Sequence, residues 1–161
     1  MKKTSAAKTT GTSMPTGISY LIGRLDRLLR RRLGEVLSPQ GLTVQQYTAL
    51  AVLGARGQLS NAQLAERSFV TPQTANEMVK GMEGRGWIER SPDPGHGRII
   101  HLRLTRTGRT ILNKGHLAAA ELEQIMLARM AQKERDLLLG HLRTCSQTLG
   151  AMIVEDGEQS I

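Results

Sequence analysis

The apolar residues of this chain recur at helical spacing over most of its length. Between residues 18 and 37 they fall every three or four positions: Ile18, Leu21, Ile22, Leu25, Leu28, Leu29, Leu33, Val36 and Leu37. This periodicity predicts a long amphipathic helix that ends near Ser38, Pro39 and Gly41. The same spacing predicts two more long helices, one that Thr105 caps and that reaches about Met130, and one from about Gln132 to Ile153.

Three shorter helices are predicted between residues 43 and 86, because each begins with a capping signal. Thr43 and Ser60 are each followed three residues later by a glutamine. In this arrangement the Thr or Ser side chain accepts a hydrogen bond from the backbone N–H of the glutamine. The glutamine side chain in turn accepts one from the backbone N–H of the Thr or Ser. Thr71 precedes Pro72, which suits the first helical position because its missing N–H has no partner to lose there. The first of these helices should end at Gly54 or Gly57, and the third at Gly84 or Gly86.

The pattern changes from helical to alternating after Gly86. Residues 87–90 (WIER) and 98–104 (RIIHLRL) predict two strands, and the stretch SPDPGHG between them predicts a hairpin tip. A helix over 60–68, a tight turn, a helix over 71–84 and a hairpin together form a helix-turn-helix with a wing. We therefore expect a mainly α fold with a small two- or three-stranded β wing and long flanking helices.

The charge of the chain points to a polyanionic partner. It has 22 Lys and Arg against 14 Asp and Glu, a net charge of +8, which favours nucleic acid first and an anionic membrane surface second. No stretch approaches the length of a membrane-spanning segment. Residues 1–17 lack the apolar core of a secretory signal, and we expect a disordered basic tail. The single cysteine, Cys145, fits a reducing compartment, so a cytoplasmic location is expected.

The helix over 71–84 carries the side chains that suit base recognition. Ala75, Met78, Val79 and Met82 share one face and should be buried. By subtraction the outward face holds Gln73, Thr74, Asn76, Glu77 and Lys80. Asn and Gln can pair with adenine, Thr with several bases, and Lys with guanine or phosphate. Thr71 at the start of this helix completes the candidate recognition set.

Contacts with the DNA backbone are expected from the residues around this helix, namely Ser60, Asn61 and Arg90. Residues 85–109 contain six arginines and the acidic residues Glu89 and Asp93, as a wing beside phosphates requires. A sequence-tolerant architectural DNA-binding protein is the alternative. The varied polar face of the 71–84 helix argues against it, because backbone binders need mainly Lys and Arg there.

The stretch LSNAQLAERSFVTPQTANEMVKGMEGRGWIERSPDPGHGRIIHLRLTRTGR resembles the winged helix-turn-helix core of the MarR (multiple antibiotic resistance regulator) family of bacterial transcription factors. The resemblance extends over residues 18–155. It implies an obligate homodimer, a palindromic double-stranded DNA operator and, often, a repressor released by a small phenolic or anionic ligand. The broad Leu, Ile and Val faces of the first and last helices also favour a dimer. We therefore divide the chain into the tail (1–17), a dimerisation region (18–38 and 106–155) and a DNA-binding domain (42–105).

At the wing tip the chain departs from the family's pattern. Arg98 matches the arginine that enters the minor groove, but the aspartate that usually precedes it by two residues is replaced by His96. Either Asp93 substitutes for that aspartate, or a protonated His96 joins Arg98 at the phosphates. In the second case operator affinity should fall between about pH 6 and 8, and the fall should be absent from His96→Ala.

Other kinds of chemistry find little support. The chain shows no phosphate-binding loop, nucleophile triad or carboxylate pair, so neither an enzyme nor a cofactor is expected. Its four histidines lack metal-ligand spacing, and no metal is expected. Cys145 lies one turn after His141 and suits a buried or interface position better than an oxidant sensor. An effector pocket should lie where the long helices meet the DNA-binding domain, with Arg24, Tyr47 and His116 as candidates. A regulator that does not respond to any ligand is a further alternative.

Overall fold

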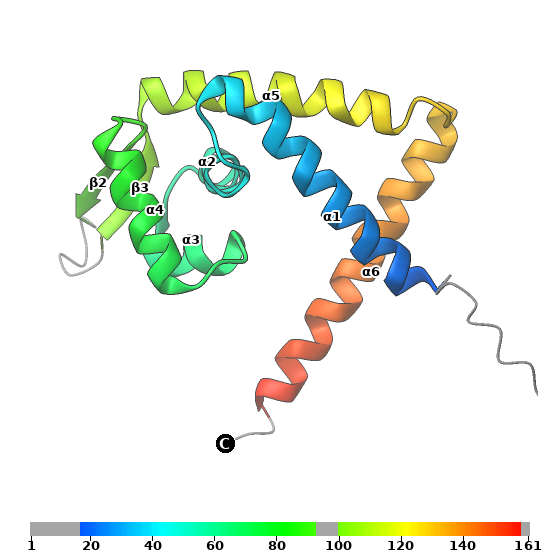
Figure 1. Cartoon of the computed structure of the whole chain (residues 1–161). Coiled ribbons are helices and arrows are strands. Elements are labelled where there is room, and N and C mark those ends of the chain that lie inside the picture. The colour runs from blue at the N-terminus through cyan, green and yellow to red at the C-terminus, as the bar shows by residue number, and fades with distance from the viewer. Residues whose placement is uncertain (1–16, 93–99, 159–161) are drawn as a thin grey trace, which may run out of the picture.

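The computed structural model describes residues 17–92 and 100–158, and side chains up to residue 150. The described elements are, in chain order, α1 (Ile18–Leu37), the 3-10 helix η1 (Ser38–Gln40), α2 (Val44–Arg56), β1 (Leu59–Ser60), α3 (Asn61–Arg67), α4 (Pro72–Gly84), β2 (Ile88–Pro92), β3 (Ile100–Leu104), α5 (Arg106–Met126) and α6 (Gln132–Glu158). This order confirms the mainly helical winged helix-turn-helix with long flanking helices. Figure 1 shows the winged domain on one side, α5 running across it, and α1 and α6 leading away.

Local capping sets where the short helices begin. Both predicted capping boxes are present: the Gln46 amide N–H donates to Thr43 Oγ1 over 3.1 Å, and the Ser60 amide N–H donates to Gln63 Oε1 over 2.9 Å. Thr71 and Thr105 cap α4 and α5 through their hydroxyl oxygens, which accept the backbone N–H groups of Thr74 and Gly108. The helix over 44–56 ends at Gly57, whose φ of 78° is a backbone conformation that glycine adopts readily.

The wing is a three-stranded antiparallel sheet in the order β1-β3-β2. The hairpin of β2 and β3 was expected, with Ile88 paired to Leu104 and Pro92 to Ile100. The third strand, β1, pairs Leu59 with Leu102 and Ser60 with His101. A strand of two residues is too short to show alternation, so periodicity could not have found it. Strand β2, the first strand of the predicted hairpin, continues beyond Arg90 to Pro92.

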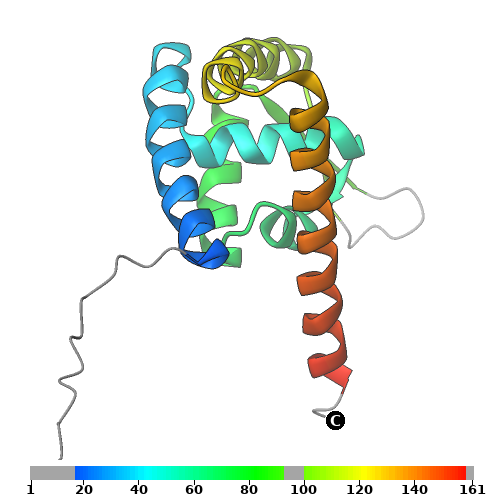
Figure 2. The ribbon, with the colours of Figure 1, turned by 90° about the vertical axis from the view of Figure 1, so that its right-hand side faces the viewer.

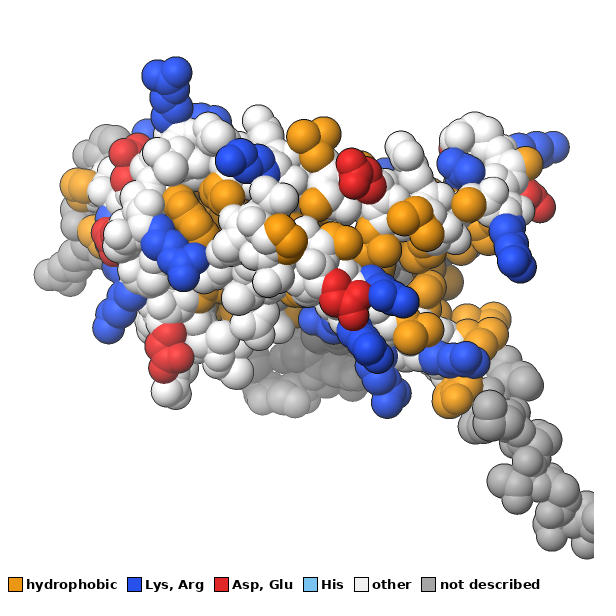
Figure 3. Space-filling model, turned by 45° about the horizontal axis from the view of Figure 1, so that its top comes forward, with side chains coloured by type: hydrophobic (Ala, Val, Ile, Leu, Met, Phe, Trp, Pro, Cys, Tyr) orange, Lys and Arg blue, Asp and Glu red, His pale blue; other side chains and the backbone are white. Residues whose placement is uncertain are grey.

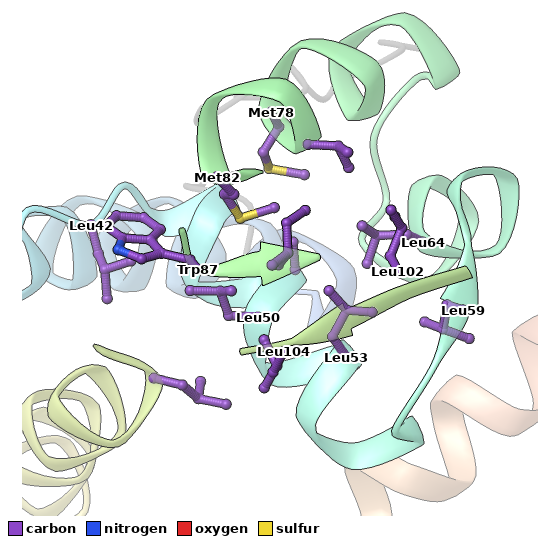
Figure 4. Close-up of a cluster of buried hydrophobic side chains, with 14 of the residues drawn as sticks. Leu42, Leu50, Leu53, Leu59, Leu64, Met78, Met82, Trp87, Leu102 and Leu104 are labelled. Carbon is purple, nitrogen blue, oxygen red and sulfur yellow. The ribbon is translucent and has the colours of Figure 1, made fainter. Parts of the chain in front are cut away.

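One hydrophobic core holds the winged domain together, and Figure 4 shows its side chains meeting from α2, α3, α4 and the sheet. Leu50 and Leu53 of α2, Leu64 of α3 and Met82 of α4 are fully buried, as is Leu102 of β3. The core thus fixes α4 against the wing by its apolar face and leaves the opposite face to solvent.

The predicted end of the long helix that Thr105 caps was wrong: α5 stops at Met126 and does not reach Met130. The chain turns there through short-range bonds, among them Ala128 N–H to Ile125 O and Met130 N–H to Leu127 O. Glu134 then accepts the Ala131 amide N–H over 2.7 Å and begins α6. No Gly or Pro marks this turn in the sequence, and apolar residues continue through it at helical spacing. The spacing therefore predicted a helix that reaches Met130.

Helix α6 projects away from the rest of its own chain. α1 and α6 cross in the view of Figure 1, but Figure 2 shows them on opposite sides of the molecule. Helix α1 packs against α5 instead. Figure 3 shows hydrophobic side chains gathered on the part of the molecule formed by these outer helices. The exposed ones include Leu21, Leu25 and Leu28 of α1, Leu117 and Ile125 of α5, and Leu137, Leu142 and Leu149 of α6.

Candidate nucleic-acid interface

The helix-turn-helix is built from α3, a turn over residues 68–70, and α4. In the turn, Val70 N–H donates to Ala65 O over 3.1 Å, which closes the chain back on α3. Phe69 has a positive φ of 55°, and its side chain is 90% exposed. Thr71 then caps α4 by accepting the Thr74 amide N–H over 3.1 Å, with Pro72 in the first turn. The turn and cap therefore start α4 at the predicted residue.

Helix α4 has the two faces that the sequence predicted. Ala75, Met78, Val79 and Met82 are buried. On the other face Gln73, Asn76, Glu77 and Lys80 are exposed, and Thr74 is half-buried. An exposed row of amide, hydroxyl and ammonium groups on one helix can meet the hydrogen-bonding edges of bases in a major groove.

Several of the predicted site residues are bonded to one another. Asn61, the first residue of α3, donates from Nδ2 to Asn76 Oδ1 on α4 over 2.8 Å. The hydroxyls of Thr71 and Thr74 lie 2.9 Å apart. Gln73 Nε2 lies 3.5 Å from Glu77 Oε1. The Asn61–Asn76 bond joins two residues 15 positions apart, and no local pattern in the sequence predicts it.

The wing places basic side chains beside α4. Arg90 on β2 donates from Nε to Glu83 Oε2 of α4 over 2.9 Å, an ion pair at the surface. Arg103 on β3 donates to the Gln58 side chain, and this ties the sheet to the segment after α2. His96 and Arg98, the predicted wing-tip residues, lie outside the described residues, as does Asp93.

Arg85, at the end of α4, was not among the predicted site residues. Its guanidinium lies 4.9 Å from the centre of the Trp87 ring, and its Nη1 donates to Gly41 O over 3.0 Å. Gly41 belongs to the link between α1 and α2. Arg85 therefore joins the end of the candidate recognition helix to the segment that leads out of the winged domain.

Two of the three candidate pocket residues meet. Tyr47 Oη on α2 lies 3.0 Å from His116 Nδ1 on α5, and the two rings pack edge to face. Burial raises the pKa of the Tyr47 phenol, and the carboxylate of Glu123 raises it further. The third candidate, Arg24, is exposed on α1. Next to His116, α2, β3 and α5 enclose a hollow of about 440 Å³, whose polar lining is Arg109, Asn113 and His116.

The remaining sequence-level expectations concern single groups. Cys145 is exposed on α6, so its expected burial is not met within one chain, and an interface position stays a prediction. The arginines of α1 are surface groups: Arg30 pairs with Asp26, and Arg31 and Arg32 with Glu35, whose pKa these hydrogen bonds lower.

Among the described residues no acidic, histidine or cysteine cluster could hold a metal ion, and no helix is long and apolar enough to cross a bilayer.

Comparisons with known proteins agree on one family. Residues 40–99 match the profile of the MarR family. The HTH-type transcriptional repressor Rv2887 of Mycobacterium tuberculosis is 30% identical over 118 residues, which are 73% of this chain and 85% of that protein. The HTH-type transcriptional repressor NicR of Pseudomonas putida is 26% identical over 146 residues, 88% of this chain and 92% of its own.

Two solved structures share the fold. Rv2887 in complex with p-aminosalicylic acid aligns with a TM-score of 0.70 at 26% identity, over 81% of this chain and 99% of that one. MarR from E. coli in complex with operator DNA aligns with a TM-score of 0.70 at 24% identity, over 80% and 92%.

Proposed function

The chain belongs to the MarR family of transcription regulators, and from that premise we propose a homodimeric repressor that binds a palindromic operator and is released by a small aromatic or anionic ligand. As a member of this family it is a regulator and not an enzyme. The observation that carries the proposal is the exposed polar face of α4, fixed in place by its buried opposite face. In this proposal residues 42–105 bind DNA, and residues 18–38 and 106–155 form the dimer.

Helix α4 is assigned to the major groove. Gln73, Thr74, Asn76 and Lys80 contact base edges, and Thr71 sets the start of the helix that carries them. Helices of this kind read bases with residues near their N-terminal end, and Gln73, Thr74 and Asn76 are there. Each good bidentate pair discriminates against the wrong base by about 1–3 kcal/mol.

Backbone contacts position the domain on the duplex. Ser60 and Asn61 at the start of α3 and Arg90 on the wing are assigned to phosphates. Arg90 is held by Glu83 in the free protein, so it exchanges or shares that partner on binding. His96 and Arg98 are assigned to the wing tip on sequence alone. Arg98→Ala should weaken operator binding and reduce the slope of log affinity against log salt by about one unit. A slope equal to that of the wild type would remove Arg98 from the backbone.

Selection from a random duplex library, followed by gel shift with competing random DNA at physiological salt, tests the DNA assignment. A sequence-specific regulator should enrich a palindrome, and Gln73→Ala should flatten the preference at one position in each half-site. An architectural DNA-binding protein would enrich no sequence, and random DNA would compete as well as any selected duplex.

The exposed apolar residues of the outer helices support the dimer. Leu117 is 69% exposed and Ile125 74% exposed in the single chain, and α1 and α6 each carry further exposed leucines. Large apolar side chains left exposed in such number mark a protein–protein interface. A two-fold axis through it would set two copies of α4 about one DNA turn, roughly 34 Å, apart.

Light scattering on size-exclusion fractions measures the oligomeric state. Leu142→Asp places a charge on the exposed apolar side of α6 and should give monomers that no longer bind the selected palindrome. Gln45→Asp adds the same charge on the surface of α2 and should remain dimeric. A wild-type protein that elutes as a monomer would contradict the proposal.

The ligand is assigned to the hollow beside His116. Arg109 supplies a cation there, and apolar side chains such as Leu104 and Leu112 supply contacts for a ring. This lining suits an aromatic acid, and the relative Rv2887 is crystallised with one. A ligand releases DNA only if it binds the free form more tightly than the DNA-bound form. Salicylate or p-aminosalicylate should raise the melting temperature and dissociate the gel-shifted complex, and Arg109→Gln should weaken both effects. A regulator without a ligand response would show neither effect in the wild type.

A further inference from the structure

Asn61 and Asn76 form a pair across the helix-turn-helix. Asn61 stands at the first position of α3, and Asn76 lies on the exposed face of α4 that is assigned to base recognition. The bond between them runs from Asn61 Nδ2 to Asn76 Oδ1 and measures 2.8 Å. Asn61 is half-buried whereas Asn76 is exposed. Asn61 on α3 therefore holds the side-chain amide of Asn76 on α4.

The Asn61 amide makes no other polar contact within the described residues. Its Oδ1 is buried there without a hydrogen-bond donor, which is unfavourable because the oxygen has left water and gained no partner. The α3 capping box uses Ser60 and Gln63 and does not need this amide. What the Asn61 side chain does in the free protein is thus to hold Asn76.

The Asn61 NH₂ group can only donate, so while it faces Asn76 the Asn76 amide turns its oxygen toward α3. An unrestrained asparagine at the surface can turn its amide by half a revolution and offer either the oxygen or the NH₂ group at a given place. Here Oδ1 is turned toward α3, and Nδ2 lies on the other side of the group. A bidentate contact with a base edge depends on this order, because acceptor and donor positions on the base are fixed. Ordering the amide before binding also lowers the entropy lost on binding.

We propose that Asn61 is a positioning residue that sets the orientation of the Asn76 amide and so contributes to base preference without itself touching a base. The inference rests on the proposed function, in which α4 lies in the major groove. This role is additional to the phosphate contact proposed for Asn61 above, which would add affinity to every sequence equally because phosphates carry no sequence information.

The test compares base preferences of full-length variants by selection from the same random duplex library. Asn61→Ala should flatten the preference at the one position in each half-site that Asn76→Ala also flattens, by roughly 5- to 150-fold in the ratio of best to next base. The double variant should flatten that position no further than Asn76→Ala alone. Thermal unfolding without DNA shows that each variant is folded.

Asn61→Asp gives the sharper result. The aspartate carboxylate can only accept, so Asn76 must turn its Nδ2 toward α3 and present Oδ1 in its place. The preferred base at that position should then change, and not simply weaken. Gln63→Glu is the matched control, since it adds the same charge to the first turn of α3 and keeps the capping acceptor. This control should lower overall affinity through its charge and leave the preferred bases as they are.

Two results would overturn the inference while the proposed function stands. One is an Asn61→Ala protein that loses affinity by the same factor on all sequences and keeps its base preferences. The other is an Asn61→Asp protein with the preferences of Gln63→Glu. A wild-type protein that enriches no sequence would instead contradict the proposed function itself.

Discussion

Gly108, in the first turn of α5, packs directly against the backbone of Trp87, the residue before β2. A Cβ built there would lie 1.9 Å from Trp87 O and 2.8 Å from Trp87 C. Both are backbone atoms, so no side chain can move aside. The same Trp87 O accepts hydrogen bonds from the Thr105 amide over 3.0 Å and from the Thr105 hydroxyl over 3.2 Å. We predict that Gly108→Ala destabilises the protein because the helix must move away from this carbonyl.

The magnitude follows from opposing effects. Alanine is favoured over glycine inside a helix by about 1 kcal/mol. Overpacking of a tight site costs about 1–3 kcal/mol or more. Displacing Thr105 also weakens its cap on the Gly108 amide, at 3.0 Å, which contributes about 1 kcal/mol. Together these effects give a net loss of about 1–3 kcal/mol, which lowers Tm by roughly 2–4 °C per kcal/mol in a chain of this length.

Thermal and urea unfolding at one fixed protomer concentration would measure the effect, because association changes apparent stability. Two other glycines provide controls. A Cβ at Gly81 meets nothing within 4 Å, so Gly81→Ala should be neutral or raise stability by up to about 1 kcal/mol. At Gly115 a Cβ meets the Tyr47 ring at 2.8 Å, and the cost should be intermediate since a side chain can shift. If Gly108→Ala is as stable as Gly81→Ala, the close approach of α5 to Trp87 is not as described.

Three further predictions concern stability. Phe69→Gly should be more stable than Phe69→Val by about 1–2 kcal/mol in urea unfolding, because φ is positive there and the exposed ring packs little; equal stabilities would argue against the left-handed turn. The pKa of Tyr47 is raised in the folded state, so its contribution to stability should be intact below about pH 10 and be lost as pH rises further, and Tyr47→Phe should show a smaller loss of stability above about pH 10. Arg85→Ala should cost about 1–2 kcal/mol, since it removes both the contact with the Trp87 ring and the hydrogen bond to Gly41 O; an unchanged urea midpoint would show that this link contributes nothing to stability.

The parts of the fold that the sequence predicted are those encoded locally. The starts of α2, α3, α4 and α5 depend on cap residues three positions from their partners, and these can be read directly. The buried face of α4 likewise follows from spacing within one helix. The end of α5 was missed because the turn at residues 127–131 uses backbone bonds and Glu134 in place of Gly or Pro.

The contacts within the candidate site depend on tertiary structure and could not be read from the sequence. Asn61 and Asn76 lie 15 positions apart, Arg85 and Gly41 lie 44 apart, and Tyr47 and His116 lie 69 apart. Tyr47 and His116 were named singly as pocket candidates, but nothing in their spacing paired them. Spacing identifies the residues of a face, whereas the pairing across faces requires the packed fold.

Because the chain is synthesised from its N-terminus, α1 must wait for the helix against which it packs. Helix α1 is complete at residue 37, but α5, against which it packs, begins only at residue 106. At about 5–20 residues per second, the ribosome needs roughly 3–14 s to bridge that gap. In that interval the winged domain can begin to fold on its own local contacts, while the part of α1 that packs against α5 stays uncovered. Slow translation of residues 38–105 would lengthen this exposure and with it the demand on chaperones.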